Sequence, residues 1–515
     1  MTISSRFVVG WGGWALGAAL ALGACGESSP FDPRTDHETL VPEHARLDTP
    51  EPRNASRVAE RESLLAEGWG EVSPGPGEPH VARVLGGGSA PETGAQPVRL
   101  AAFVHLADIQ LTDDESPGRV ARIDGPGITS AAYRPHDAYS CHLLAAMTRS
   151  IHTVDAALRD EQGAGLDFVL LGGDNIDNAQ TNELRYLQEL LGPAATVECD
   201  SGADDDPVPG LQPDPNDPKD PFDAPGLALP YYWVTGNHDV LVQGNLVPNA
   251  LSQAEVTGGT SVGFARDWSQ PGGPLGRTLA PDSERAYLSR AGLLEAVMAD
   301  GSGHGVGAEQ AASGRATYAF DVPDSRLRVI VVDSSAPRGA AGGVILHAEL
   351  EGTIRPLFEA AAQDGKWVIV TAHHASASLG DGSGTGGAFE ADAITPEEWN
   401  DFLSAQPHLL LSLVAHSHRH RLNELSGAEG SVFELLTASL ADFPHQARVI
   451  EVTDEDNGYV RVRATCLNVS VQGDPVAAEG LRLGVLDYAV GWADSSESTP
   501  GDRNVDLYVP RPAGP

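Results

Sequence analysis

The chain has 515 residues, with 33 lysines and arginines against 72 aspartates and glutamates, which gives a formal charge of −39 at neutral pH. A surface this acidic repels phosphate backbones, so a nucleic-acid-binding protein held by counterion release is excluded. Hydrophobic residues make up 41% of the chain and charged residues 20%, an ordinary composition for a folded protein. The length allows one large α/β domain or two of medium size. Four cysteines are too few for a disulfide scaffold.

The N-terminus has the pattern of an export signal. A positive charge at Arg6 precedes an apolar stretch over residues 7–22, and small residues lead to Cys25. The sequence Leu22-Gly23-Ala24-Cys25 resembles a bacterial lipobox, which implies a signal peptide over residues 1–24 and a lipid on the Cys25 thiol. The alternative is an uncleaved membrane helix, which the glycines of the apolar stretch disfavour. We therefore expect the protein in the bacterial cell envelope, outside the cytoplasm, with the lipid as its only membrane attachment.

Composition divides the rest of the chain. Residues 25–95 are rich in proline, glutamate, glycine and serine and predict a disordered tether. Residues 96–470 predict the folded domain, and residues 471–515 a C-terminal extension packed on it. Two stretches interrupt the domain. We expect a solvated acidic insertion at 200–226, and a long glycine-rich loop at 250–315 that is either a lid or disordered.

Predicted strands and helices alternate from residue 98 onwards. Apolar residues at intervals of three and four over 144–158 predict a helix. Thr395-Pro396-Glu397-Glu398 has the N-cap, the first-turn proline and the capping-box glutamate of a helix start. Strands that alternate with helices predict an α/β fold, and after residue 430 the pattern turns to strands. The short apolar runs that predict strands are 100–106, 168–171, 231–235, 327–332, 367–372 and 409–414.

A small polar cluster follows five of these predicted strands. Ligand groups at the carboxyl ends of strands in an α/β sheet converge on one crevice, so residues far apart in the sequence can share a site. Aspartates, an asparagine and histidines offer mixed oxygen and nitrogen ligands, which suit Mn, Fe or Zn. A carboxylate shared by two ligand sets would hold two metals about 3.5–4 Å apart, an arrangement that clamps a phosphoester and generates a bridging hydroxide. The clusters are Asp108-Ile109-Gln110, Gly172-Gly173-Asp174-Asn175-Ile176-Asp177, Gly236-Asn237-His238-Asp239, His373-His374 and His416-Ser417-His418.

These clusters, in this order, resemble the motifs of the calcineurin-like metallophosphoesterase superfamily, which includes purple acid phosphatases and cyclic-nucleotide phosphodiesterases. The Gly-Asp-x-x-Asp and Gly-Asn-His-Asp motifs are complete, and the resemblance covers about residues 95–470. It implies a two-sheet β-sandwich flanked by helices, in four layers ordered αββα. It also implies the hydrolysis of a small phosphoester substrate with two divalent metal ions and a bridging hydroxide.

The resemblance assigns roles to single residues. It gives two ligand sets that share one bridging carboxylate: Asp108, Gln110, Asp174 and His418 for one metal, and Asp174, Asn237, His373 and His416 for the other. His238 would be the catalytic histidine near the phosphoryl group, oriented by Asp239, and Asn237 would help to stabilise the developing charge.

Three positions depart from the family's pattern. Gln110 stands where the family usually has histidine, Ala415 where it usually has glycine, and Ala375 where a proline commonly follows the histidine pair. An amide oxygen is a weaker and harder ligand than an imidazole nitrogen, so we expect the first metal to bind less tightly than the second. Either His373 or His374 fits the ligand position, and we expect His373.

Two rival functions stay open at this point. One is a metal-binding or structural lipoprotein that keeps the fold with a site impaired at Gln110. The other is an esterase, because Gly259-Thr260-Ser261-Val262-Gly263 fits the pattern of a nucleophile elbow, although no apolar strand precedes it. The pairing among Cys141, Cys199 and Cys466 is also open, since at most one disulfide can form between them.

Replacing Cys25 tests the lipobox. The substitution C25S removes the thiol that would carry the lipid, and the acidic chain has no second predicted membrane attachment. We expect the variant to move from the detergent phase to the aqueous phase in a detergent-partitioning experiment. The matched variant C466S, which removes a cysteine outside the lipobox, should partition like the wild type. Unchanged partitioning of C25S would refute the lipobox.

Overall fold

The computed structural model describes residues 32–127, 129–202, 218–299, 301–493 and 498–512. The predicted signal peptide and Cys25 lie outside the described residues, as does the middle of the predicted acidic insertion. The described residues belong to the unit that begins at Asp32. Within them, none of the helices combines the length and the apolar character that a membrane span requires.

The larger of the two main sheets has seven strands in the order β3-β19-β18-β17-β4-β5-β8. β4, β5 and β8 run parallel to one another, so their carboxyl ends lie at one edge of the sheet. β17, β18 and β19 continue the sheet antiparallel from β4. The strands are β3 (Val81–Val84), β4 (Val98–Leu106), β5 (Phe168–Leu171), β8 (Tyr231–Trp233), β17 (Gln446–Asp454), β18 (Tyr459–Asn468) and β19 (Val505–Pro510).

The second main sheet has six strands in the order β11-β12-β13-β14-β16-β15. Its four central strands are parallel, and its two edge strands are antiparallel to their neighbours. The carboxyl ends of β13 and β14 therefore also point to a common edge. The strands are β11 (Tyr318–Asp321), β12 (Leu327–Val332), β13 (Trp367–Ala372), β14 (Leu409–Val414), β15 (Arg421–Gly427) and β16 (Gly430–Leu436).

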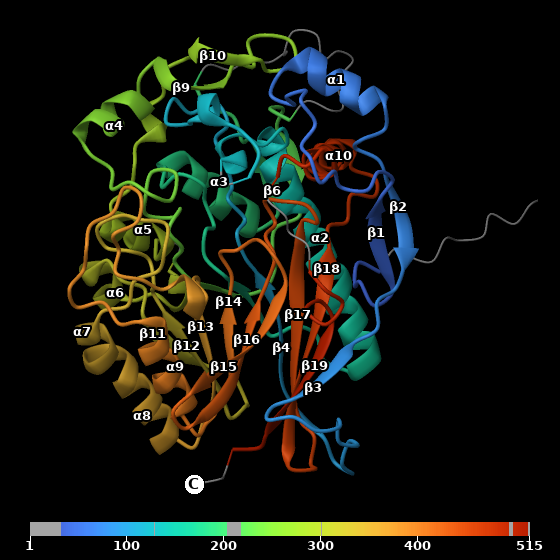
Figure 1. Ribbon diagram of the computed structural model, residues 1–515, viewed down its shortest axis with the longest axis vertical. Coiled ribbons are helices and arrows are strands. Elements are labelled where there is room, and N and C mark those ends of the chain that lie inside the picture. Colours follow the sequence, from blue (N-terminus) through green and yellow to red (C-terminus); the bar gives the residue numbers. More distant parts are fainter. Residues whose placement is uncertain (1–31, 128, 203–217, 300, 494–497, 513–515) are drawn as a thin grey trace, which may run out of the picture. The chain divides into compact units, whose positions relative to one another are not determined.

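The two sheets pack face to face, because alternate residues of the central strands are apolar on both faces. In β12, Val329 and Val331 belong to the same buried cluster as Phe103 of β4, whereas Ile330 and Val332 pack against helices on the outer face. Burial on both faces explains why these strands are continuous apolar runs in the sequence. Figure 1 shows the four layers, with α8 and α9 on one side of the sheets and α2 on the other. The predicted α/β sandwich with flanking helices is confirmed.

The two helices that the sequence predicts are present in the structure. Thr395 caps α9 with its hydroxyl, which accepts a hydrogen bond from the Glu398 amide, and the Glu398 carboxylate accepts one from the Thr395 amide. The predicted helix over 144–158 lies within α2. The helices are α1 (Val58–Ala66), α2 (Ser140–Gln162), α3 (Thr181–Leu191), α4 (Ala250–Val256), α5 (Arg290–Val297), α6 (Ala308–Ser313), α7 (His347–Glu349), α8 (Arg355–Gln363), α9 (Pro396–Ser404) and α10 (Pro475–Ala489).

The prediction of a disordered tether is wrong for residues 32–95. β1 (Glu38–Pro42) pairs with β2 (Val72–Pro76), and β3 pairs in parallel with β19 of the large sheet. Leu64 of α1 is fully buried in a cluster with Trp268 and with Leu486 of α10. The few apolar side chains of this segment are thus covered by distant parts of the chain, which its own composition does not reveal.

Two further boundaries differ from those predicted. Residues 250–315 are not a featureless loop, since they hold α4, α5, α6 and the hairpin of β9 (Thr260–Arg266) with β10 (Leu275–Thr278). The C-terminal extension is an integral part of the domain, because β19 lies inside the large sheet between β18 and β3.

A small hairpin of β6 (Ala195–Val197) and β7 (Phe222–Ala224) borders the acidic insertion. A disulfide joins Cys141 to Cys199, and Cys466 stays free and buried.

Leu64 tests whether the N-terminal segment is part of the folded domain. Replacing its buried side chain by alanine leaves a cavity, so L64A should lower the free energy of unfolding by about 2–5 kcal/mol. The matched control is Leu251 on α4, which is 83% exposed, and L251A should have an effect below about 0.5 kcal/mol. Urea denaturation measures both values. Equally small effects would mean that the segment does not pack on the domain.

Candidate metal centre

The ends of five strands bring the predicted site residues together. Asp108 follows β4, Asp174 follows β5, and His373 and His418 follow β13 and β14. Nε2 of His373 lies 3.0 Å from Asp174 Oδ2 and 3.8 Å from Asp108 Oδ1, and Nε2 of His418 lies 3.3 Å from Asp108 Oδ1. The backbone amide of His416 donates to Asp108 Oδ2 over 3.1 Å. The site therefore joins the carboxyl edges of both sheets.

The backbone at these strand ends is strained in a common way. Five residues of the predicted ligand sets have left-handed backbones, with φ of 46° at Asp108, 43° at Gln110, 51° at Asp174, 71° at His416 and 53° at His418. Such angles are rare for residues other than glycine and cost on the order of 1 kcal/mol each. They turn the chain sharply at the strand ends, so that these side chains can share one small volume.

One glycine is required by the same close packing. Gly173 has φ of 90°, and a Cβ atom there would lie 2.6 Å from His373 Nδ1. A side chain at this position would displace the imidazole from the site. The glycine of the Gly-Asp-x-x-Asp motif thus leaves room for a histidine that comes from the other sheet.

Hydrogen bonds fix which nitrogen of each imidazole faces the carboxylates. Nδ1 of His373 donates to the Gly172 carbonyl over 2.9 Å, and Nδ1 of His418 donates to the Asp442 carboxylate. In the neutral imidazoles, Nε2 therefore presents a lone pair to Asp174 in the first case and to Asp108 in the second. A lone pair that faces a carboxylate oxygen is repelled unless a cation lies between them.

Three polar atoms of the site are buried and make no hydrogen bond among the described residues. They are Asp108 Oδ1, His373 Nε2 and Asn237 Oδ1. The Asn237 amide is oriented by its other end, because Nδ2 donates to the Gly244 carbonyl over 3.0 Å. Unpaired buried polar atoms are costly and rare. A carboxylate oxygen, an imidazole nitrogen and an amide oxygen are ligand atoms for divalent cations, so the residues present fit a metal.

The pKa values of two histidines show that the buried carboxylates of the site attract positive charge. Burial acts to lower the pKa of His373, but Asp174 and Asp108 outweigh it and raise this pKa to about 9. Burial is likewise outweighed at His418, where Asp108 and Asp442 raise the pKa to about 10. Burial and the neighbouring His373 lower the pKa of His416 to about 4. Without a metal, protons therefore occupy the two places where a cation fits.

The structure separates His373 from His374. Nε2 of His374 donates to the Ala341 carbonyl over 2.9 Å, and Nδ1 lies 2.8 Å from the Ser334 hydroxyl. Both nitrogens of His374 are therefore engaged, although the ring lies in a cluster with His373 and His416. His373 is the histidine of this pair that has a nitrogen without a hydrogen bond.

Gln110 lies beside the site, but its amide oxygen already has a partner. Oε1 accepts a hydrogen bond from Nη2 of Arg134 over 2.8 Å. Nε of Arg134 also donates to Asp442, the carboxylate that holds His418. Neither Arg134 nor Asp442 belongs to a motif, so nothing in the sequence singled them out. We leave Gln110 out of the ligand set proposed below.

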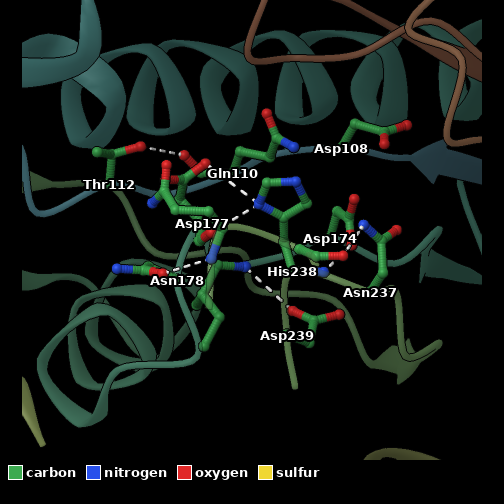
Figure 2. A network of polar contacts seen from close by, with 12 residues as sticks. Asp108, Gln110, Thr112, Asp174, Asp177, Asn178, Asn237, His238 and Asp239 are labelled. Atoms are coloured by element: carbon green, nitrogen blue, oxygen red, sulfur yellow. Dashed lines mark hydrogen bonds and ion pairs between the residues drawn. The ribbon is translucent and has the colours of Figure 1, made fainter. Parts of the chain in front are cut away.

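The prediction that Asp239 orients His238 is wrong. The Asp239 carboxylate accepts hydrogen bonds from the amides of Asn175, Ile176 and Gly236, and so ties the ends of β5 and β8 together. Nδ1 of His238 donates instead to the Asp177 carbonyl over 2.6 Å, as Figure 2 shows. Asp177 is the second aspartate of the Gly-Asp-x-x-Asp motif, and that signal could have identified it.

Asp177 also sets the charge of His238. Burial acts to raise the pKa of Asp177, but the buried guanidinium of Arg119 holds it at about 2. Burial acts to lower the pKa of His238, yet Asp174 and Asp177 outweigh it and raise this pKa above its ordinary value. The His238 backbone amide is held as well, since it donates to Asp174 Oδ1 over 2.7 Å. His238 is therefore an imidazole of fixed orientation whose protonated form is favoured by the neighbouring carboxylates.

A cavity of about 540 Å³ opens above the site and is lined by His238, His416, His418 and Arg134, among others. The rival nucleophile, Ser261, is not in this cavity. It is fully buried in β9, where its hydroxyl donates to the Pro117 carbonyl over 3.0 Å. Ser261 therefore lacks the exposure that a nucleophile needs.

Comparison with known proteins gives only distant likenesses. No family model matches the chain, and no curated protein matches it. A dimetal phosphatase from Danio rerio has 12% identity over 72% of this chain and 99% of its own, with a TM-score of 0.37. The sulfate thiohydrolase SoxB from Thermus thermophilus, in complex with glycerol, has 11% identity over 76% of this chain and 60% of its own, with a TM-score of 0.31. The purple acid phosphatase PPD1 from yellow lupin seeds has 11% identity over 86% of this chain and 56% of its own, with a TM-score of 0.32. All three TM-scores lie below 0.5, so these likenesses do not assign a function.

Metal binding should release protons. At about pH 8 the metal-free protein holds protons on His373 and His418, because their pKa values are about 9 and about 10. A cation that binds Nε2 must displace the proton there, so titration with Mn²⁺ should release about two protons per chain. The release should fall by about two protons between pH 8 and about pH 11, where both imidazoles are neutral. Calorimetry in buffers of different ionisation enthalpy measures it.

Two variants serve as controls for this titration. H418Q should release about one proton fewer, because one of the two titrating groups is gone. H347N changes an imidazole on α7 that is 47% exposed, and should release as many protons as the wild type. A release that does not change between pH 8 and pH 11 would contradict the binding of metal at these nitrogens.

Proposed function

We propose that the protein is a metal-dependent phosphoesterase of the calcineurin-like superfamily with a dinuclear centre. The observation that carries this proposal is the cluster of Asp108, Asp174 and His373, in which Asp108 Oδ1 and His373 Nε2 lie 3.8 Å apart, are buried and lack hydrogen bonds among the described residues. A binding protein would not need a histidine that is fixed by hydrogen bonds at the wall of the cavity above the site. His238 thus favours an enzyme over a structural lipoprotein.

The geometry supports two cation positions. Asp108 and His418 face one another at the first, and Asp174 and His373 face one another at the second. We propose Asp108, Asp174 and His418 as ligands of one metal, and Asp174, Asn237, His373 and His416 as ligands of the other. Two divalent ions bound there, Mn, Fe or Zn, would supply Lewis-acid charge and a hydroxide nucleophile.

His238 is the proton donor in this proposal. Its Nδ1 is held by the Asp177 carbonyl, so Nε2 is the nitrogen left to face a substrate in the cavity. A proton on Nε2 can pass to the leaving oxygen or neutralise a phosphoryl oxygen. Asp174 and Asp177 outweigh burial and raise the pKa of His238 above its ordinary value, which favours the protonated form; the proton is lost as the pH rises through that pKa.

We further propose that the protein acts outside the cytoplasm on a lipid anchor at Cys25. The lipobox-like sequence supports this location. So does the disulfide between Cys141 and Cys199, because disulfides persist in oxidising compartments. The acidic charge of −39 agrees with a small phosphoester, rather than a nucleic acid, as the partner.

The test is turnover of an aryl phosphate by the purified protein with and without Mn²⁺, for the wild type and H238A. Wild-type turnover should require the metal and return when the metal is restored after chelation. H238A should lower turnover by about a hundredfold or more and leave the metal content unchanged, because a general acid acts on the transition state without being a ligand.

D174N is the comparison for H238A. It removes charge from the carboxylate shared by both proposed metals, so it should lose metal as well as activity. Loss of one metal equivalent in H238A would make that histidine a ligand and overturn its role. Metal binding by the wild type without any turnover would favour the structural lipoprotein instead.

A further inference from the structure

Arg134 is held rigidly at the wall of the cavity. Its side chain is 3% exposed. Nε donates to Asp442 Oδ1 over 2.6 Å, and Nη2 donates to Gln110 Oε1 over 2.8 Å. The Arg134 backbone amide is also fixed, because it donates to the Asp137 carboxylate over 3.0 Å. The guanidinium is therefore pre-organised, and little conformational entropy is lost when it binds a ligand.

One nitrogen of this guanidinium is left for an occupant of the cavity. Among the described residues, no hydrogen bond engages Nη1, and Arg134 lines the cavity together with His238 and His418. The position is close to the proposed metals, since Asp442 contacts both Arg134 and His418, and His418 in turn faces Asp108. An anion bound at the metal centre would lie near this donor.

The cavity lining holds more arginines than carboxylates. Arg134 and Arg419 line it, and Asp442 is the carboxylate among the lining residues. The whole chain has a formal charge of −39. A local excess of positive charge in so acidic a protein favours a ligand with more than one negative charge.

Gln110 holds Arg134 without adding a second negative charge. Asp442 already forms an ion pair with the guanidinium, and a carboxylate at position 110 would add another charge, whereas the amide oxygen of Gln110 does not. The family usually has histidine at position 110. Here Gln110 stands in its place, and its amide oxygen orients Arg134 rather than a metal.

We propose that Arg134 binds the phosphoryl group of the substrate and makes the site select phosphate monoesters over diesters. This inference rests on the proposed function. Near neutral pH a monoester carries nearly two negative charges and has three oxygens outside the ester bond. A diester carries one charge and has two such oxygens. Arg134 would be a third cationic group beside the two metals. Only the monoester has the additional negative charge and the additional acceptor oxygen that this arginine can bind.

The experiment compares Arg134 variants on p-nitrophenyl phosphate and on methyl p-nitrophenyl phosphate, both assayed with Mn²⁺. R134M should lower kcat/KM for the monoester by about tenfold to a hundredfold, the value of a charged hydrogen bond, and for the diester by less than about threefold. R134K keeps the positive charge but lacks the paired N–H groups of the guanidinium. Its kcat/KM for the monoester should lie between those of the wild type and R134M. R57M removes a guanidinium that is 73% exposed on the surface and should change kcat/KM for neither ester.

Two further measurements separate the possible outcomes. Metal content and thermal unfolding of each variant show whether the metal centre and the fold are intact. If R134M does not fold, R134K replaces it in the comparison of the two esters. Calorimetric titration with inorganic phosphate tests Arg134 without catalysis, and its affinity should fall about tenfold or more in R134M. If the wild type hydrolyses neither ester, the proposed function fails, while the phosphate titration still decides the role of Arg134. Equal losses on both esters, or unchanged phosphate affinity, would overturn the selection of monoesters by Arg134.

Discussion

The site depends on one electrostatic conflict that the fold enforces. Asp108 and Asp174 are buried within about 4 Å of imidazole nitrogens whose hydrogen bonds leave lone pairs facing them. Protons or metal ions must lie between these groups, because a buried negative charge without a partner is unstable. Packing of the two sheets prevents the residues from moving apart, so the binding of a cation is the way in which the conflict is relieved.

The surrounding residues orient the ligand atoms that face the cation. Three of the proposed ligands are held at the end that does not face the site: His373 by the Gly172 carbonyl, His418 by Asp442 and Asn237 by the Gly244 carbonyl. Such outer contacts fix the tautomer and the ring orientation. Asp442 acts on two groups at once, because it orients His418 and also holds Arg134. A change at Asp442 would therefore affect the metal and the phosphate-binding group together.

The sequence predicts the central strands well and the margins of the domain badly. The strands over 168–171, 327–332, 367–372 and 409–414 have the predicted bounds, because burial on both faces leaves a continuous apolar run in the sequence. Residues 32–95 fold only against distant parts of the chain, and composition cannot report such contacts. Motif order predicts residues that the fold places at neighbouring strand ends, but Arg119 and Arg134 belong to no motif, and their contacts depend on the three-dimensional fold.

The pairing of β3 with β19 joins two strands that lie far apart in the sequence. β3 lies at the edge of the large sheet, and its neighbour there, β19, is formed by Val505–Pro510. The two strands are separated by more than four hundred residues, so this edge has one of the longest loop closures the chain allows. β3 has no partner until residues 505–510 have been made, so this edge of the sheet can form only after synthesis has passed residue 510. Shortening the chain by its last strand would therefore unpair the first strand of the same sheet as well.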